Sequence, residues 1–162
     1  MFFGEIDTIL SASTIEAIES LVGGTCELVE PSTRSVNVIP LTSPRALGTA
    51  AIARLTRALL DPHSWSFARK RCLPRRTAVL RLQGPKGNVK VEIDAFCSGW
   101  VLSASNERRG GFFDPVRTQI IEMLKSAFPE YASTNPRSLW RSGIIHELKC
   151  KSQSLNAPRA SS

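Results

Sequence analysis

Several features that mark membrane and secreted proteins are missing from this sequence of 162 residues. It contains no run of about 18 apolar residues, so no segment has the composition of a membrane-spanning helix. The first 30 residues contain no lysine or arginine, and acidic residues stand where a secretory signal would carry basic ones. We therefore expect a cytoplasmic protein that does not act in a membrane.

Closely spaced metal ligands are missing as well. The four cysteines lie far apart, and neither His63 nor His146 supplies the ligand pair that zinc sites usually contain. The sequence therefore implies no metal and no cofactor, and reduced thiols that pack as small apolar groups are expected. A disulfide between Cys72 and Cys97 remains an alternative in an oxidising compartment, because these residues flank a predicted hairpin.

Catalytic motifs are equally scarce. No serine lies in a Gly-x-Ser-x-Gly elbow, and the short segment at residues 84–87 is no glycine-rich phosphate loop. Cys97 would need a nearby base to act as a nucleophile, and the sequence does not identify one. These absences favour a protein that is not an enzyme.

The clearest pattern that is present lies between residues 77 and 129. Residues 77–83 and 88–94 alternate between apolar and polar, and the turn-forming residues between them indicate a β-hairpin. Residues 106–111 are interpreted as a break. A helix is then predicted from Asp114, as its N-cap, to Pro129, with Pro115 in its first turn. Its apolar stripe comprises Val116, Ile120, Leu124, Ala127 and Phe128.

Two further helices and two short strands are predicted before this hairpin. Ser13 and Glu16 form a capping-box pattern at the start of one helix. The other helix is expected to begin at Ser43, followed by proline, and to end at Leu60. Residues 26–30 and 36–41 are the strand candidates.

The expected fold class is therefore α+β, with a small antiparallel sheet built around a central β-hairpin and helices packed on one face. Residues 1–131 are predicted to form a single domain. The composition changes beyond Tyr131, and residues 132–162 are expected to be a basic, disordered C-terminal tail. A short helix at residues 138–148 would form only by docking on the domain.

Lys90, Glu92 and Asp94 share one face of the second hairpin strand. Two carboxylates beside a lysine resemble the donor set of metal-dependent nucleases, but the order of the residues differs from such sites. The favoured interpretation is the solvated polar face of a half-buried strand. Replacing Glu92 with alanine is accordingly expected to change stability little.

The best candidate for function is a basic segment that begins with two aromatic residues. Charge is unevenly distributed along the chain: the net charge is +7, although residues 1–30 contain six acids and no base. The segment could bind an acidic protein, or it could bind phosphates while a ring stacks on a base. The alternative is a solvated loop in which Trp65 and Phe67 cap the core. The candidate binding residues are Trp65, Phe67, Arg69, Lys70, Arg71, Arg75 and Arg76.

These patterns lead to a ranked set of functions. The first is a non-enzymatic cytoplasmic binding module for a macromolecule, with an acidic protein as the favoured partner. The second is a nucleic-acid-binding protein that uses residues 69–76, and the third is an enzyme of unrecognised type.

Four short motifs give the chain a resemblance to a group of uncharacterised bacterial proteins. They are the Leu-Asp-Pro at residues 60–62, the cysteine before the hairpin, the Ala-Phe-Cys at residues 95–97 and the Phe-Asp-Pro helix that ends in Phe-Pro. Asp94 stands where that group has a further cysteine at the end of the second strand. The resemblance implies a bacterial α+β domain and no particular activity.

Overall fold

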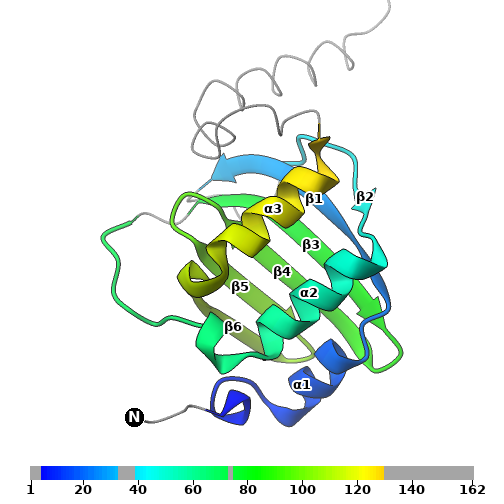
Figure 1. Ribbon diagram of the computed structural model, residues 1–162, viewed down its shortest axis with the longest axis vertical. Coiled ribbons are helices and arrows are strands. Elements are labelled where there is room, and N and C mark those ends of the chain that lie inside the picture. The colour runs from blue at the N-terminus through cyan, green and yellow to red at the C-terminus, as the bar shows by residue number, and fades with distance from the viewer. Residues whose placement is uncertain (1–4, 33–38, 73–74, 130–162) are drawn as a thin grey trace, which may run out of the picture.

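The computed structural model describes residues 5–32, 39–72 and 75–129. Together they form an α+β fold in which three α-helices lie across one face of a six-stranded antiparallel sheet (Figure 1). The strand order is β2-β1-β3-β4-β5-β6. The strands are β1 (Gly23–Ser32), β2 (Arg45–Ala46), β3 (Arg76–Gly84), β4 (Gly87–Asp94), β5 (Gly99–Ala104) and β6 (Glu107–Phe112). The fold class predicted from the sequence is confirmed.

The predicted hairpin is the centre of this sheet. In the antiparallel pair of β3 and β4, Ala78 lies opposite Ile93 and Gly84 lies opposite Gly87, which leaves Pro85 and Lys86 as the turn. Gly84 is required here because a Cβ at this position would lie 2.4 Å from the carbonyl oxygen of Ser20. The tip of the hairpin therefore packs closely against the end of the first helix.

The sheet is larger than predicted because residues after the hairpin continue it. β5 pairs with β4, and β6 pairs with β5. In the second pair, Gly99 lies opposite Phe112 and Ala104 lies opposite Glu107. The prediction of a break at residues 106–111 is therefore wrong. Two glycines and two arginines suggested a loop, but pairing with β5 overrides their weak strand preference.

α1 (Ala12–Glu19) begins slightly earlier than the sequence indicated. Its N-cap is Ser11, whose hydroxyl accepts a hydrogen bond from the backbone N–H of Thr14, so Ser13 lies inside the helix. The hydroxyl of Ser11 also donates to the carboxylate of Glu107 at 2.7 Å. This contact joins the start of α1 to the beginning of β6.

α2 (Thr49–Leu60) begins later than predicted. Its N-cap is Gly48, while Arg45 and Ala46 pair with Cys26 and Thr25 as the short edge strand β2. A serine followed by proline is a common helix start, but here the next residues extend the sheet instead. The strand predicted at residues 26–30 lies within β1.

α3 (Arg117–Ala127) is preceded by the 3-10 turn η3 (Asp114–Val116). The predicted N-cap is wrong, because Asp114 begins η3 and the N-cap of α3 is Val116. The carboxylate of Asp114 pairs with Lys70 instead. The predicted apolar stripe is largely correct: Ile120, Leu124 and Phe128 are at most 2% exposed.

The hydrophobic core lies between the helices and one face of the sheet. The apolar positions of β3, β4 and β5 alternate in register, so that Leu80, Val91 and Leu102 lie side by side beneath the helices. None of these three side chains is exposed. We call this the covered face of the sheet and its opposite the open face.

Within the described residues, no helix has the length and apolar character needed to cross a membrane.

Other predictions fall outside or at the limits of the described residues. Pro40 forms an isolated bridge with Val29, but residues 36–38 of the second predicted strand are not described. The predicted tail and its short helix also lie outside the described residues.

Candidate partner-binding surface

The basic segment predicted as the binding site lies beyond the β6 edge of the sheet, between the 3-10 turn η2 (Pro62–Ser64) and β3 (Figure 1). Ser66 fixes its first part to the sheet, because Ser66 and Phe112 exchange two backbone hydrogen bonds of 2.8 Å. The structure thus places this segment beside the last strand rather than beside the hairpin alone.

Trp65 belongs to the core and not to the binding surface. Its side chain is 6% exposed, and its indole N–H donates a 3.0 Å hydrogen bond to the carbonyl of Leu59. The ring packs 4.8 Å from that of Trp100 and covers Gly111, where a Cβ would lie 2.9 Å from it. The role of aromatic anchor is therefore wrong for Trp65, because the ring is not accessible, and the alternative that it caps the core is correct.

Phe67 is the accessible aromatic residue of the segment. It is 58% exposed and lies 6.3 Å from Trp65, with the two rings nearly parallel. An exposed phenylalanine supported by a buried ring is held in place, which suits a contact surface.

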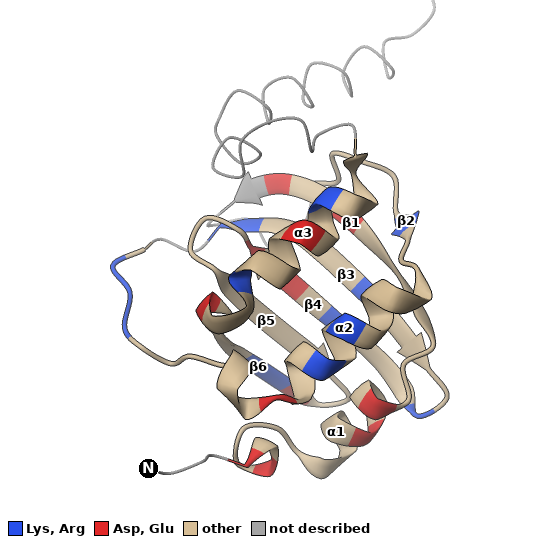
Figure 2. Cartoon of the chain, viewed as in Figure 1, with Lys and Arg blue, Asp and Glu red and all other residues tan. Residues whose placement is uncertain are grey.

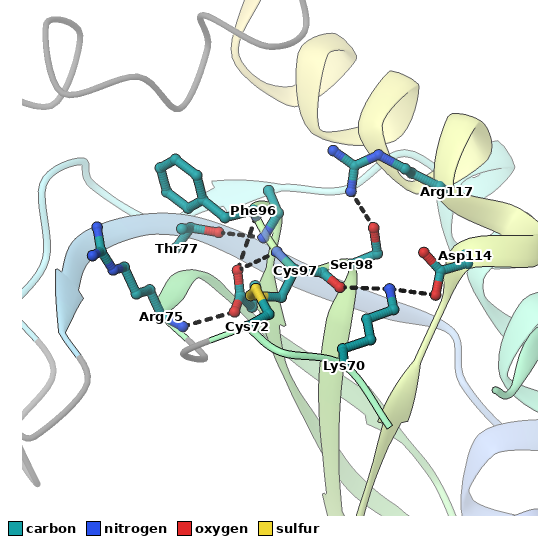
Figure 3. The surroundings of a disulfide bond; sticks show 11 residues. Lys70, Cys72, Arg75, Thr77, Phe96, Cys97, Ser98, Asp114 and Arg117 are labelled. Carbon is teal, nitrogen blue, oxygen red and sulfur yellow. Dashed lines mark hydrogen bonds and ion pairs between the residues drawn. A yellow bond between two sulfur atoms is a disulfide. The ribbon is translucent and has the colours of Figure 1, made fainter. Parts of the chain in front are cut away.

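Lys70 holds the segment in position. Its ammonium donates to the carbonyl of Cys97 at 2.9 Å and lies 2.5 Å from the carboxylate of Asp114 (Figure 3). It also lies 4.5 Å from the centre of the Phe112 ring. Because its charge is already balanced, Lys70 contributes more to the shape of the surface than to its net charge.

Arg69, Arg71 and Arg75 differ from Lys70 in having exposed and unbalanced charges. All three are exposed, and within the described part of the chain none of their guanidinium groups pairs with an acid. Only the backbone of Arg75 is fixed, since its N–H donates to the carboxylate of Asp94 at 2.7 Å. These three residues provide the net positive charge of the segment.

A disulfide between Cys72 and Cys97 ties the segment, directly after Arg71, to the turn after β4 (Figure 3). The expectation of reduced thiols is therefore wrong for this pair, and the alternative left open by the sequence is correct. Cys97 has no free thiolate, which removes it as a candidate nucleophile. Burial, followed by the neighbouring charge of Glu27, raises the pKa of the Cys26 thiol to about 12, so it remains protonated.

Asp94 organises the turn that carries Cys97. Its carboxylate accepts hydrogen bonds from the backbone N–H groups of Phe96 and Cys97 at 2.9 and 3.0 Å, in addition to that of Arg75 (Figure 3). It is only 6% exposed. The predicted solvated role of Asp94 is therefore wrong: it is buried and bound to three backbone donors.

Glu92 is buried on the open face by basic side chains. It is 6% exposed, and its carboxylate lies 2.9 Å from Nε of Arg76, 3.3 Å from Nζ of Lys90 and 3.6 Å from Nη2 of Arg108. Three cations around one carboxylate leave local positive charge. The expectation of a solvated Glu92 is wrong, because residues from two other strands, β3 and β6, reach it.

A pocket of about 450 Å³ connects Glu92 with the basic segment. Its lining combines apolar, aromatic and charged groups, including Phe67, Arg76, Glu92, Val101, Arg108 and Phe112. The prediction from sequence identified Phe67 and Arg76 but missed Arg108 and Phe112. The two arginines of β6 were visible in the sequence, but the glycines beside them indicated a loop and concealed the strand.

A carboxylate also lies at the margin of the covered face. Glu107 accepts hydrogen bonds from the backbone and the hydroxyl of Ser11. Burial favours its neutral form, but the hydrogen bonds from Thr14 and Ser11, together with nearby Arg109, outweigh it and lower the pKa of Glu107. This residue stabilises the junction between α1 and β6.

Figure 2 shows how charge is distributed over the elements. α1 carries acidic residues and no basic ones, whereas basic residues mark β3, β6 and the segment before β3. The described residues contain no group of three or more histidine, cysteine, aspartate or glutamate side chains placed to bind a metal ion. The strongest feature of the surface is thus basic charge next to an aromatic pocket.

Comparison with known proteins adds no relative. No protein-family model matches the chain, and no curated protein or solved structure matches it either. The resemblance to a group of bacterial proteins remains a prediction.

Proposed function

We propose that this chain is a non-enzymatic binding module whose partner is an acidic protein. The observation that carries the proposal is the unbalanced charge of Arg69, Arg71 and Arg75 beside the pocket around Glu92. Of the five basic residues of the segment, Lys70 and Arg76 already pair with acids, and the other three are exposed. Exposed arginines next to an accessible aromatic ring are typical of protein interfaces.

A nucleic acid is the alternative partner, supported by the same arginines and by the exposed ring of Phe67. Burial of Trp65 weakens this alternative, because one of the two rings expected to stack on bases is inaccessible. If the three arginines contact phosphates, the logarithm of affinity should fall with the logarithm of salt concentration with a slope of about −3.

The test compares the wild type with two variants that each lose three positive charges. The first carries Arg69→Gln, Arg71→Gln and Arg75→Gln. The matched control carries Arg54→Gln, Arg57→Gln and Lys86→Gln, which remove exposed charges from α2 and the hairpin turn. Each protein is immobilised and used to capture partners from a native lysate, with and without nuclease.

We expect the first variant to lose a nuclease-resistant acidic partner that the wild type and the control retain. Its association with that partner should slow more than its dissociation accelerates, because exposed charges mainly steer encounter. A partner that nuclease removes would support the nucleic-acid alternative. Equal capture by all three proteins would contradict both functions.

The compartment determines which partners are available. The sequence favoured the cytoplasm, whereas a disulfide such as Cys72–Cys97 usually persists in an oxidising environment. Titration of thiols in protein isolated under alkylating conditions distinguishes the two. A cytoplasmic protein should present all four cysteines as thiols, and a protein from an oxidising compartment should lack the two of the bridge.

A further inference from the structure

The outer edge of β6 offers backbone groups that the sheet does not use. Phe112 directs its N–H and C=O outward to Ser66. Since the backbone N–H and C=O groups of successive residues point to opposite sides of a strand, those of Gly110 and Arg108 also point outward. The bridge to Ser66 is isolated, so among the described residues no strand pairs with β6 beyond Phe112. Gly110 and Arg108 are both exposed.

The side chains along this edge are chemically suited to one kind of partner. Arg108 is 67% exposed and shares Glu92 with two other cations, so its charge is only partly balanced. Gly110 has no side chain and lines the pocket together with Phe67, Val101 and Phe112. Arg108 and Gly110 are two positions apart, and therefore face the same side of the sheet.

We infer that an extended acidic peptide of the partner protein adds to β6 as a further antiparallel strand, an inference that rests on the function proposed above. One acidic side chain of the peptide would face Arg108. An aromatic side chain two residues away would face Gly110 and enter the pocket. Charge complementarity identifies the occupant, and the adjoining pocket adds specificity to the main-chain hydrogen bonds.

An opposing explanation exists for the same edge. Charged residues and short strands protect sheet edges from pairing with other chains, and Arg108 and Arg109 could serve only that purpose. The two explanations differ in one measurable respect. A protected edge binds no added strand. A receptive edge binds a peptide, and this binding depends on the peptide's backbone N–H groups.

The probe is a fluorescein-labelled peptide of about five residues, within the usual range of strand lengths. Its sequence is Thr-Tyr-Thr-Glu-Thr, so that in an antiparallel strand the tyrosine lies opposite Gly110 and the glutamate opposite Arg108, clear of the bridge between Ser66 and Phe112. Two further peptides carry N-methyl groups, one on its glutamate and tyrosine amides and the other on its threonine amides. Binding is measured by fluorescence anisotropy with the full chain.

In antiparallel pairing, the residues opposite Gly110 and Arg108 direct their N–H groups towards β6. Methylation of the glutamate and tyrosine amides should therefore weaken binding by about 10-fold or more, because each lost hydrogen bond lowers affinity several-fold. Methylation of the threonine amides should have little effect. Equal binding of the two methylated peptides would overturn strand addition.

A matched pair of variants tests the same edge from the protein side. Gly110→Pro removes the outward N–H, and it costs no hydrogen bond to β5 because that N–H points away from β5. Proline is tolerated at such edge positions. Gly110→Ala retains that N–H, and its Cβ would lie 3.8 Å from the nearest atoms. We expect Gly110→Pro to bind the peptide about 10-fold more weakly than Gly110→Ala, because both variants add atoms beside the pocket and only proline removes the N–H. The methylated peptides decide the result even if the proline variant does not fold.

Failure of this inference can be distinguished from failure of the proposed function. If an acidic partner depends on Arg69, Arg71 and Arg75 while no peptide form binds, the edge is protected and only strand addition is overturned. If the peptide binds as expected but nuclease removes every partner from lysate, the acidic-protein function fails.

Discussion

The two faces of the sheet bury their side chains by different means. On the covered face, Val91 is inaccessible because helices and neighbouring strands surround it with apolar groups. On the open face, the adjacent Glu92 is 6% exposed because Arg76, Lys90 and Arg108 surround it. The same strand therefore shows that burial and apolar packing are separate properties of this fold.

The difference has energetic consequences. Apolar burial on the covered face contributes about 25 cal/mol per Å² removed from water. The carboxylate of Glu92 loses solvation, and its interactions with three cations compensate for this loss. The cations themselves remain partly exposed to solvent. Substitutions on the covered face should thus have larger effects than those on the open face.

The largest expected effect comes from Leu124→Ala on the covered face. Leu124 is 2% exposed, so the change removes a packed side chain and leaves a cavity that costs about 2–5 kcal/mol. The measurement is the free energy of unfolding from denaturant titration. Gln119→Ala, an exposed position on the same helix, serves as the control and should change it by less than about 0.5 kcal/mol. Equal unfolding midpoints for the two variants would contradict the packing of α3.

Glu92→Gln should have the next largest effect. The substitution keeps the size of the side chain but leaves three cations without their shared carboxylate, at a cost of about 1–3 kcal/mol. Thermal and chemical unfolding of the variant measure this cost. Stability equal to that of the wild type would show that solvent already balances the three cations.

Glu107→Gln should have a smaller effect that depends on pH. The pKa of Glu107 is lowered in the folded protein, so its stabilisation is present above the unfolded value of about 4.3 and is lost as pH falls through the folded value. At neutral pH the variant should lose less than about 1 kcal/mol, since the side chain is partly exposed. The difference from the wild type should narrow in acid. A constant difference across the acidic range would exclude this carboxylate as the cause.

Lys90→Gln should have the smallest effect of the four. Lys90 is 40% exposed, and Arg76 and Arg108 still balance Glu92 after its removal. Exposed ion pairs contribute about 0–1 kcal/mol, and we expect a change of less than about 0.5 kcal/mol in unfolding measurements. A loss as large as that of Glu92→Gln would mean that Lys90 alone carries the interaction.

The sequence predicted those parts of the fold whose signals are local. The β3–β4 hairpin and the stripe of α3 are repeating patterns within a few residues, and both are confirmed. The start of α2 was wrong because Ser43 and Pro44 imitate a helix start, while pairing of Arg45 with Cys26 depends on distant residues. β6 was missed for a related reason: Gly111 indicated a loop, but its missing side chain makes room for Trp65.

The candidate site was predicted less completely than the fold. A cluster of basic residues is visible in any sequence, and the exposure of Arg69, Arg71 and Arg75 agrees with the predicted surface. Burial of Trp65 was left open as an alternative, and the sequence could not decide it because the ring packs on Trp100 of a distant strand. Burial of Glu92 was not predicted, because it depends on Arg76 and Arg108, which approach from other strands. The partner-binding role itself stays a prediction.

The bridge between Cys72 and Cys97 encloses β3 and β4 in a covalent ring and anchors the basic segment directly after Arg71. Lys70 anchors the same segment through Cys97 and Asp114. Under the proposed function, the segment would approach its partner with much of its backbone entropy already lost, and binding would need to immobilise little more. Chemical reduction of the bridge would lower affinity without removing a single contact, because the entropy would then be lost on binding.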